Sequence, residues 1–199
     1  MNIEQFLLTL CVGVGLSAAC GFRVFIPLFI VSLASRSGDL TISEGFAWLS
    51  SDTALIAFGV ATVLEIGAYY IPWLDNFLDA LASPTAVVAG TIITASMVTD
   101  MQPFLKWTLA VIAGGGAAGL VQGMTVFARG ASTLGTGGVA NPVLATAELG
   151  GAAGMGAMAV FVPILAIISL PVVVGVIIWR IQARRKQSAT PTIEAEPAV

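Results

Sequence analysis

Three ionisable residues lie within or beside long apolar runs of this 199-residue chain: Arg23, Glu65 and Glu148. An ionised side chain at the centre of a bilayer costs roughly 2.5–3.5 kcal/mol on insertion scales, so such residues are paired, face a cavity or serve a function. A buried arginine needs acceptors for its five N–H groups, and the two glutamates are the expected partners. Two roles remain open: an ion pair that fixes helix register, or a relay or cation site in which a carboxylate exchanges Arg23 for substrate or a proton.

Small polar residues and glycines followed by proline occur twice, at residues 15–27 and 130–142. This composition is typical of a helix broken inside a membrane, where freed N–H and C=O groups must meet protein, water or ligand. The ends of half-helices concentrate partial charge and could hold an ion or a polar head group. Tight helix crossings lined by small residues are the alternative. The candidate binding side chains in these segments are Ser17, Ser132, Thr133 and Asn141, and Tyr69 joins them because it lies four residues after Glu65 on one helical face.

Asp75 and Asp79 share a helical face and are weak candidates for a metal site, because carboxylate oxygens suit Mg²⁺ or Ca²⁺. A solvated face at the membrane surface also explains them. The chain has no His, no CxxC, no P-loop and no GxSxG, which excludes zinc hydrolysis with His ligands and Ser-His-Asp catalysis. The DxxxD pair also lacks the upstream elements of the CDP-alcohol phosphotransferases. An enzyme is therefore not favoured, and no cofactor is predicted.

The composition places these residues in a membrane protein. Hydrophobic residues make up 57% of the chain and charged residues 10%, and the mean hydropathy is +0.97. Soluble domains carry about 25% charged residues. We therefore predict an all-α, polytopic transmembrane bundle whose partner is the lipid bilayer, with no role for nucleic acid.

Long apolar runs separated by polar connections predict five to six spans, with broken or re-entrant helices near residues 15–27 and 130–149. The first run, residues 6–33, is long for one straight helix and contains Pro27. A short amphipathic helix is expected at residues 73–81 because its apolar residues fall on one face. The other expected spans are residues 53–71, 84–98, 104–127 and 151–179, with a short broken or re-entrant piece at about 139–149.

Charge placement predicts the orientation. Half of the eight Lys and Arg residues follow the last apolar run, at Arg180, Arg184, Arg185 and Lys186. By the positive-inside rule the C-terminus is cytoplasmic in an inner (plasma) membrane location, and about five full spans then place the N-terminus outside. We expect residues 1–186 to form a single transmembrane domain and residues 187–199 a disordered cytoplasmic tail.

Gly115, Gly119 and Gly123 form a doubled GxxxG pattern that lets another helix approach closely, so a homo-oligomer through this face is possible. An internal repeat is also open. One alignment pairs Pro27 with Pro142 at an offset of 115 residues, and another pairs Glu65 with Glu148 at an offset of 83. One simple duplication cannot give both offsets, so an inverted-repeat transporter plan remains a hypothesis.

The polar elements together resemble one family. They are Ser17 to Pro27 (SAACGFRVFIP), Glu65 with residues 68–76 (AYYIPWLDN), and residues 132–148 with Asn141-Pro142 and Glu148. In this order, over about residues 6–162, the chain resembles the bacterial membrane proteins grouped as domain of unknown function 4126. The resemblance implies an integral membrane protein, and it implies no activity or substrate.

Three functions fit the sequence. The first is a small-solute or ion transporter or channel whose broken helices and charged residues line a polar path. The second is a membrane scaffold or assembly factor in which the buried charges are a structural lock. The third is an intramembrane enzyme that uses Asp75 and Asp79 with a metal on lipid-linked substrates. The transporter ranks first because broken helices and intramembrane charges occur together.

Overall fold

The computed structural model describes residues 2–99, 101–166, 168, 171–172 and 175–176, with all side chains in these ranges except those of residues 72, 73, 75, 76 and 79. Residues 1–167 form one compact unit and residues 168–199 a second one. The unit of residues 1–167 contains every element that follows. The tail predicted at residues 187–199 and the basic cluster at residues 180–186 lie outside the described residues.

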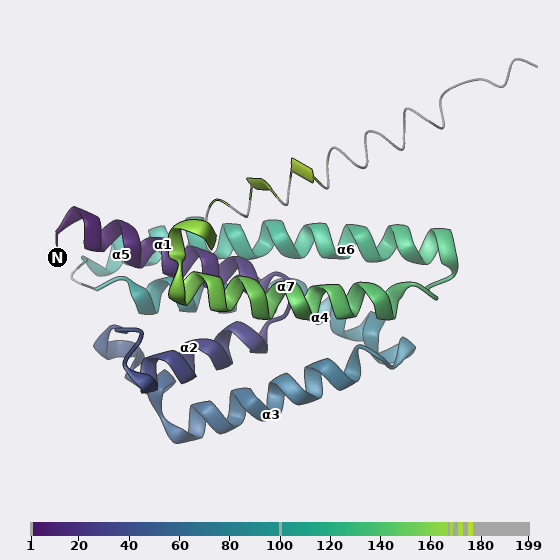
Figure 1. Ribbon diagram of the computed structural model, residues 1–199, viewed down its shortest axis with the longest axis horizontal. Coiled ribbons are helices and arrows are strands. Elements are labelled where there is room, and N and C mark those ends of the chain that lie inside the picture. Colours follow the sequence, from purple (N-terminus) through teal and green to yellow (C-terminus); the bar gives the residue numbers. More distant parts are fainter. Residues whose placement is uncertain (1, 100, 167, 169–170, 173–174, 177–199) are drawn as a thin grey trace, which may run out of the picture. The chain divides into compact units, whose positions relative to one another are not determined.

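The described part of the chain is helical and contains no β-strand, which confirms the all-α class (Figure 1). In chain order the elements are α1 (Ile3–Cys20), α2 (Phe25–Ser37), the 3-10 helix η1 (Glu44–Ser50), α3 (Asp52–Ala68), α4 (Pro72–Met97), α5 (Pro103–Leu109), the π-helical turn η2 (Ala110–Gly115), α6 (Gly116–Thr136) and α7 (Asn141–Phe161).

Several of these helices are long and apolar enough to cross a membrane. They are Ile3–Cys20, Ala80–Met97, the continuous run Pro103–Thr136, and Asn141–Phe161. The pair η1 and α3, bent by 59°, passes the same test as one broken span, which gives four or five spans among the described residues. The predicted span at residues 151–179 runs into residues outside this part, so the total number of five to six stays a prediction.

The predicted break of the first apolar run is confirmed, because α1 ends at Cys20 and α2 begins at Phe25. The second break is the turn at residues 137–140 between α6 and α7. Gly137 and Gly138 have φ values of +63° and +87°, a left-handed conformation that glycine adopts without strain.

Two predicted boundaries are wrong. Residues 73–81 are not a separate amphipathic helix, because α4 continues through Pro84 to Met97. Residues 139–149 are not an isolated short piece either, because α7 continues through Gly150 and Gly151 to Phe161. Proline and glycine weaken a helix locally, but the packing of a long apolar helix against its neighbours outweighs that cost.

Helix α1 packs against α4, α7, α6 and α2. Helix α3 lies at the edge of the unit and packs mainly on α2 and η1 (Figure 1). Glycines make the closest crossing. A Cβ atom on Gly114 of η2 would lie 2.5 Å from the backbone oxygen of Gly90 in α4. Two of the GxxxG glycines pack on the same helix of this chain: Gly115 faces Thr91 and Gly119 faces Val87 of α4. Gly123 faces open space.

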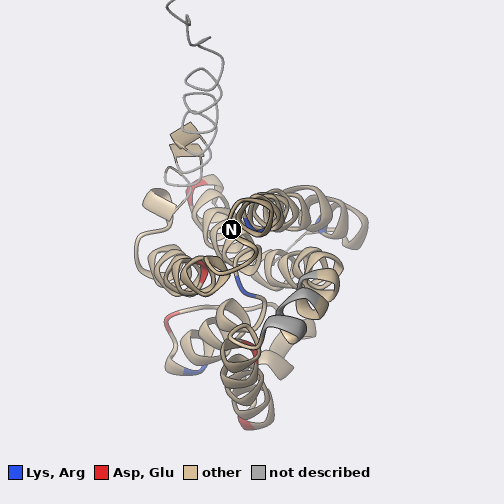
Figure 2. Cartoon of the chain, turned by 90° about the vertical axis from the view of Figure 1, so that its right-hand side faces the viewer, with Lys and Arg blue, Asp and Glu red and all other residues tan. Residues whose placement is uncertain are grey.

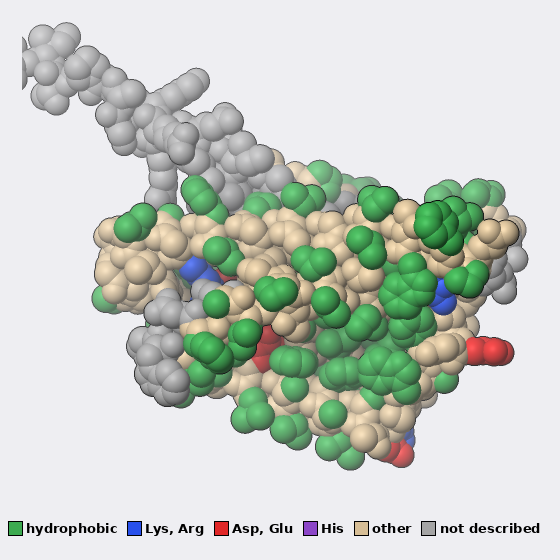
Figure 3. All heavy atoms as spheres, turned by 180° about the vertical axis from the view of Figure 1, so that it is seen from behind, with side chains coloured by type: hydrophobic (Ala, Val, Ile, Leu, Met, Phe, Trp, Pro, Cys, Tyr) green, Lys and Arg blue, Asp and Glu red, His purple; other side chains and the backbone are tan. Residues whose placement is uncertain are grey.

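The outer surface of the unit is apolar. Ile56, Val63 and Leu64 of α3 are each at least 66% exposed, and hydrophobic side chains are spread over the face seen in Figure 3. Such a surface is unfavourable in water and favourable in the hydrocarbon of a bilayer. The exposed faces therefore agree with a membrane protein of several apolar helices.

Ser17 joins α1 to α4 inside this packing. Its hydroxyl donates to the backbone oxygen of Gly90 at 2.6 Å and lies 2.9 Å from the hydroxyl of Thr94. We expect Ser17→Ala to lower the free energy of unfolding by about 0.5–1.5 kcal/mol, because α1 loses its hydrogen bond to α4 while Gly90 keeps its donor within the helix. Thermal unfolding in detergent checks this, with the exposed Thr85→Ala as the control. Equal melting temperatures for the two variants would contradict it.

Candidate functional site

A glycine at the break between α1 and α2 allows α6 to pack closely against it. A Cβ atom on Gly21 would lie 2.5 Å from the backbone oxygen of Ala118 and 2.5 Å from Cβ of Val121, so only glycine allows α6 to approach this closely. Pro27 lies in the first turn of α2, where its missing N–H leaves no helical bond unmade. The sequence thus ends one helix at residue 20 and begins the next at residue 25 inside the bundle.

Side chains from other helices satisfy the backbone groups that the break frees. The carboxylate of Glu65 in α3 accepts two N–H groups at the start of α2, from Val24 to Oε1 at 2.9 Å and from Phe25 to Oε2 at 3.2 Å. On the other side of the break, the hydroxyl of Thr125 in α6 donates to the backbone oxygen of Gln122 at 2.9 Å and lies 3.5 Å from the backbone oxygen of Gly21. Glu65 therefore caps a helix of which it is not a part, where the positive end of the helix dipole favours an anion.

Arg23 lies within the break and reaches α7. Its Nη2 donates to the backbone oxygen of Ala145 at 2.9 Å and lies 3.4 Å from Oε2 of Glu148. Glu148 is also held by Arg129 of α6, through Nε to Oε1 at 2.9 Å and through Nη2 to Oε2. One carboxylate thus bridges two guanidinium groups, and the second pair has the two-point geometry in which arginine binds a carboxylate most strongly.

Tyr69, at the end of α3, contacts both arginines through its ring. The guanidinium carbon of Arg23 is 3.4 Å from the centre of its ring and that of Arg129 is 4.5 Å away. A cation over an aromatic face is stabilised by the electrons of the ring, most strongly where water is excluded. We call Arg23, Glu65, Tyr69, Arg129 and Glu148 the polar cluster.

The polar cluster is closed and formally neutral. Its residues are between 2% and 7% exposed, and the charges of two arginines offset those of two glutamates. Figure 2 shows that the helices carry few other charged residues. The cluster nevertheless has unused donors, because Nε and Nη1 of Arg23 have no hydrogen-bond partner among the described residues. Buried donors left without a partner are costly and uncommon, so they are the feature of this site that requires an explanation.

The other predicted site residues Ser17, Thr133 and Asn141 form hydrogen bonds with partners outside the polar cluster. Ser17 binds α4, as described above. Thr133 accepts a hydrogen bond from the amide of Asn141 at 3.3 Å across the turn between α6 and α7, and Ser132 lies in the last part of α6. The side chains of Asp75 and Asp79 lie outside the described residues. Among those that are described, no group of three or more His, Cys, Asp or Glu residues could hold a metal ion.

Arg129 was missed as a candidate because it precedes a run rich in Gly, Ser and Thr that resembles a loop. In the structure this run continues α6, and Arg129 is 3% exposed. A signal was present in the sequence: Gln122, Thr125 and Arg129 are spaced by three and four residues, which places them on one helical face. All three are buried, so this polar face of α6 points into the unit.

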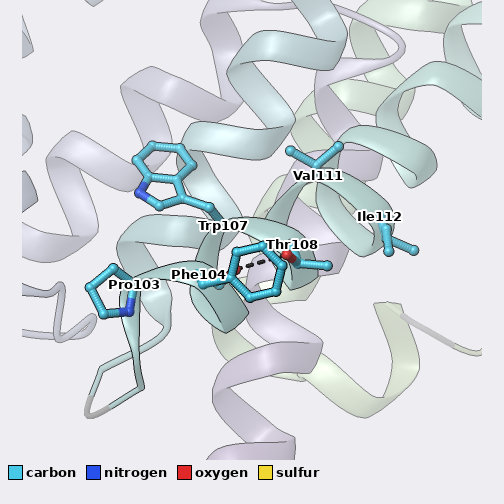
Figure 4. A pocket seen from close by; sticks show the side chains of 6 residues that line it. All are labelled: Pro103, Phe104, Trp107, Thr108, Val111 and Ile112. Carbon is cyan, nitrogen blue, oxygen red and sulfur yellow. Dashed lines mark hydrogen bonds between the residues drawn. The ribbon is translucent and has the colours of Figure 1, made fainter.

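A second feature, an open hollow of about 550 Å³, lies at α5 and η2 (Figure 4). Its lining residues are Pro103, Phe104, Trp107, Thr108, Val111 and Ile112. The hydroxyl of Thr108 is already bonded to the backbone oxygen of Phe104 at 2.8 Å. This lining offers apolar contact and no charge, so it is a poorer site for a polar solute than the polar cluster.

One comparison with known proteins gives a match. A family model described as "Domain of unknown function (DUF4126)" matches residues 10–183, a range that includes the whole polar cluster. Neither the comparison with curated proteins nor the comparison with solved structures gives a significant match. Because the family model covers most of the sequence, the chain belongs to the DUF4126 family of proteins.

Proposed function

We propose that this membrane protein moves a small solute or ion across the bilayer, with the polar cluster as its binding site. The observation that carries the proposal is the break between α1 and α2, where Glu65 accepts two backbone N–H groups and the buried Arg23 has donors without a partner among the described residues. Interrupted helices that present backbone groups to a solute near the bilayer midplane are a recurring design of transporters.

The low exposure of the cluster corresponds to an occluded state, so the solute enters only when an element moves. Helix α3 is the best candidate for that element. It carries Glu65 and Tyr69, packs mainly on α2 and η1, and meets η1 at a bend of 59°. A rotation of α3 about this bend would withdraw Glu65 from α2 and open the cluster, as in hinge motions of other proteins.

Flux through proteoliposomes tests this function. The full chain is reconstituted, and entry of alkali cations, small anions and neutral solutes is measured for the wild type, for Glu65→Gln and for the exposed control Glu4→Gln. We expect Glu65→Gln to abolish the flux of the transported solute, because an uncharged amide accepts only one of the two N–H groups. The control is expected to retain the flux. Flux that Glu65→Gln leaves unchanged, or no flux of any solute in the wild type, would contradict the proposal.

A structural lock is the second candidate function, and the double pairing of Glu148 favours it. A scaffold or assembly factor would use the Arg23–Glu148–Arg129 contacts to fix the order of its helices. In that case Glu65→Gln lowers stability and alters no flux, and partner proteins co-purify with the chain. Contact between two copies through the open Gly123 belongs to this alternative and predicts a dimer by crosslinking in membranes.

The membrane and the orientation are part of the same proposal. We place the chain in the inner (plasma) membrane with its C-terminus in the cytoplasm, on the basis of the basic residues at 180–186. Labelling of single cysteines introduced into the tail, in whole cells and in inverted vesicles, distinguishes the two sides.

A further inference from the structure

The carboxylate of Glu65 occupies a site that suits a free anion equally well. Its two oxygens each accept one N–H group at the start of the 13-residue helix α2, at 2.9 Å and 3.2 Å. Neither N–H belongs to the helix that carries Glu65. The donors and the helix dipole would bind any group with two oxygens at the spacing of a carboxylate.

Arg23 supplies an independent indication of a ligand. It is 2% exposed and directly precedes Val24 and Phe25 in the chain. Its Nη2 is used by Ala145 and Glu148, while Nε and Nη1 have no hydrogen-bond partner among the described residues. Each of these two groups can donate to one oxygen of an anion, so Arg23 has capacity left for an oxyanion beside the start of α2.

Charge balance limits what can enter. With Glu65 in place, the arginines and glutamates of the polar cluster cancel, and an extra anion would leave a net negative charge in a closed site. If Glu65 withdraws as the anion arrives, the balance is kept. A cation has no such exchange partner, because Glu148 is already bound by Arg23 and Arg129.

We propose that a small planar oxyanion of the carboxylate class, with acetate and formate as representatives, binds Val24 N–H, Phe25 N–H and Arg23 in exchange for the side chain of Glu65. The proposal deepens the transport function and rests on it for its physiological role. Glu65 acts as an internal competitor: it keeps the site filled when no solute is present and expels the solute when it returns. Without its charge, the site binds the oxyanion more tightly and releases it more slowly.

Chemical rescue tests this exchange. The full chain carrying Glu65→Ala is reconstituted in nanodiscs, and its melting temperature is followed as sodium acetate or sodium formate replaces sodium chloride at constant ionic strength. We expect a rise on the order of 5 °C at saturation, because a ligand that binds only the folded state stabilises it. Acetamide, which has the shape of acetate and no charge, should give no rise. The wild type and Glu4→Ala, in which Glu65 fills the site, should give none either.

The contribution of Arg23 is measured in the same background. We expect Glu65→Ala with Arg23→Lys to need roughly tenfold more acetate for the same rise, because lysine has no counterpart of the free Nε and Nη1 groups. If Glu65→Ala does not fold, Glu65→Gln replaces it, with acetate binding read by calorimetry. No rise with any oxyanion, or an equal rise with acetamide or in Glu4→Ala, would overturn the exchange.

The outcomes separate the inference from the transport function. Flux of a solute in proteoliposomes together with no rescue would overturn the oxyanion site and leave transport standing. Rescue by acetate in a protein that moves no solute would support the oxyanion site and remove transport.

Discussion

Glu148→Gln is expected to lower the free energy of unfolding by about 3–5 kcal/mol, because it leaves Arg23 and Arg129 buried with no carboxylate between them. The two arginines are 2% and 3% exposed, so water cannot replace the lost partner. Thermal or denaturant unfolding of the full chain in detergent measures the change. The effect is large because buried positive charge loses the carboxylate that offsets it, which costs more than the net contribution of the ion pair itself.

The matched control is an ion pair at the surface. Arg36 and Asp52 are paired with side-chain exposures of 45% and 75%, and Arg36→Gln should cost less than about 1 kcal/mol. Adding Arg129→Gln to Glu148→Gln should cost less than the sum of the single losses, because the two residues share one interaction. A loss for Glu148→Gln no greater than that for Arg36→Gln would show that the polar cluster does not hold these helices together.

Gly21→Ala is the second large change. The added methyl group would lie 2.5 Å from the backbone oxygen of Ala118 and 2.8 Å from the backbone nitrogen of Gln122, so α1 and α6 must separate. We expect the free energy of unfolding to fall by about 1–3 kcal/mol, which is typical of overpacking. The contacts around the break, where Arg23 lies, should weaken as well.

Gly116→Ala in α6 is the control, because a Cβ atom there meets nothing within 4 Å. Alanine is the better helix former by about 1 kcal/mol, so this variant should be as stable as the wild type or more stable. Unfolding of the two variants side by side in one detergent checks both expectations. Gly21→Ala with the stability of Gly116→Ala would mean that the two helices are not packed as closely as described.

The sequence predicts the helical membrane class and a break within residues 15–27, because composition and a run of small polar residues and glycines followed by proline are local signals. It does not predict the continuity of α4 through Pro84 or of α7 through Gly150 and Gly151. Those helices persist because their apolar faces pack on distant segments, and hydropathy along the chain does not record such contacts.

In the polar cluster, too, some features follow from local signals in the sequence and others depend on distant contacts. The cost of an intramembrane charge singles out Arg23, Glu65 and Glu148 without any structure, and the pair Arg23–Glu148 is present. The use of Glu65 as a cap for α2 depends on a contact between residues about 40 positions apart, which no local pattern encodes. Arg129 was hidden because a glycine-rich run that looks like a loop is the end of α6.

An experimental structure of the Glu65→Ala variant, crystallised with sodium acetate, examines the exchange most directly. We predict density for acetate beside the N–H groups of Val24 and Phe25, with its carboxylate within hydrogen-bond distance of Arg23. Crystals of the wild type grown with acetate, and crystals of the variant grown with acetamide, should lack this density. Density for Val24, Phe25 and Arg23 with no acetate beside them in the variant would contradict an oxyanion site at the start of α2.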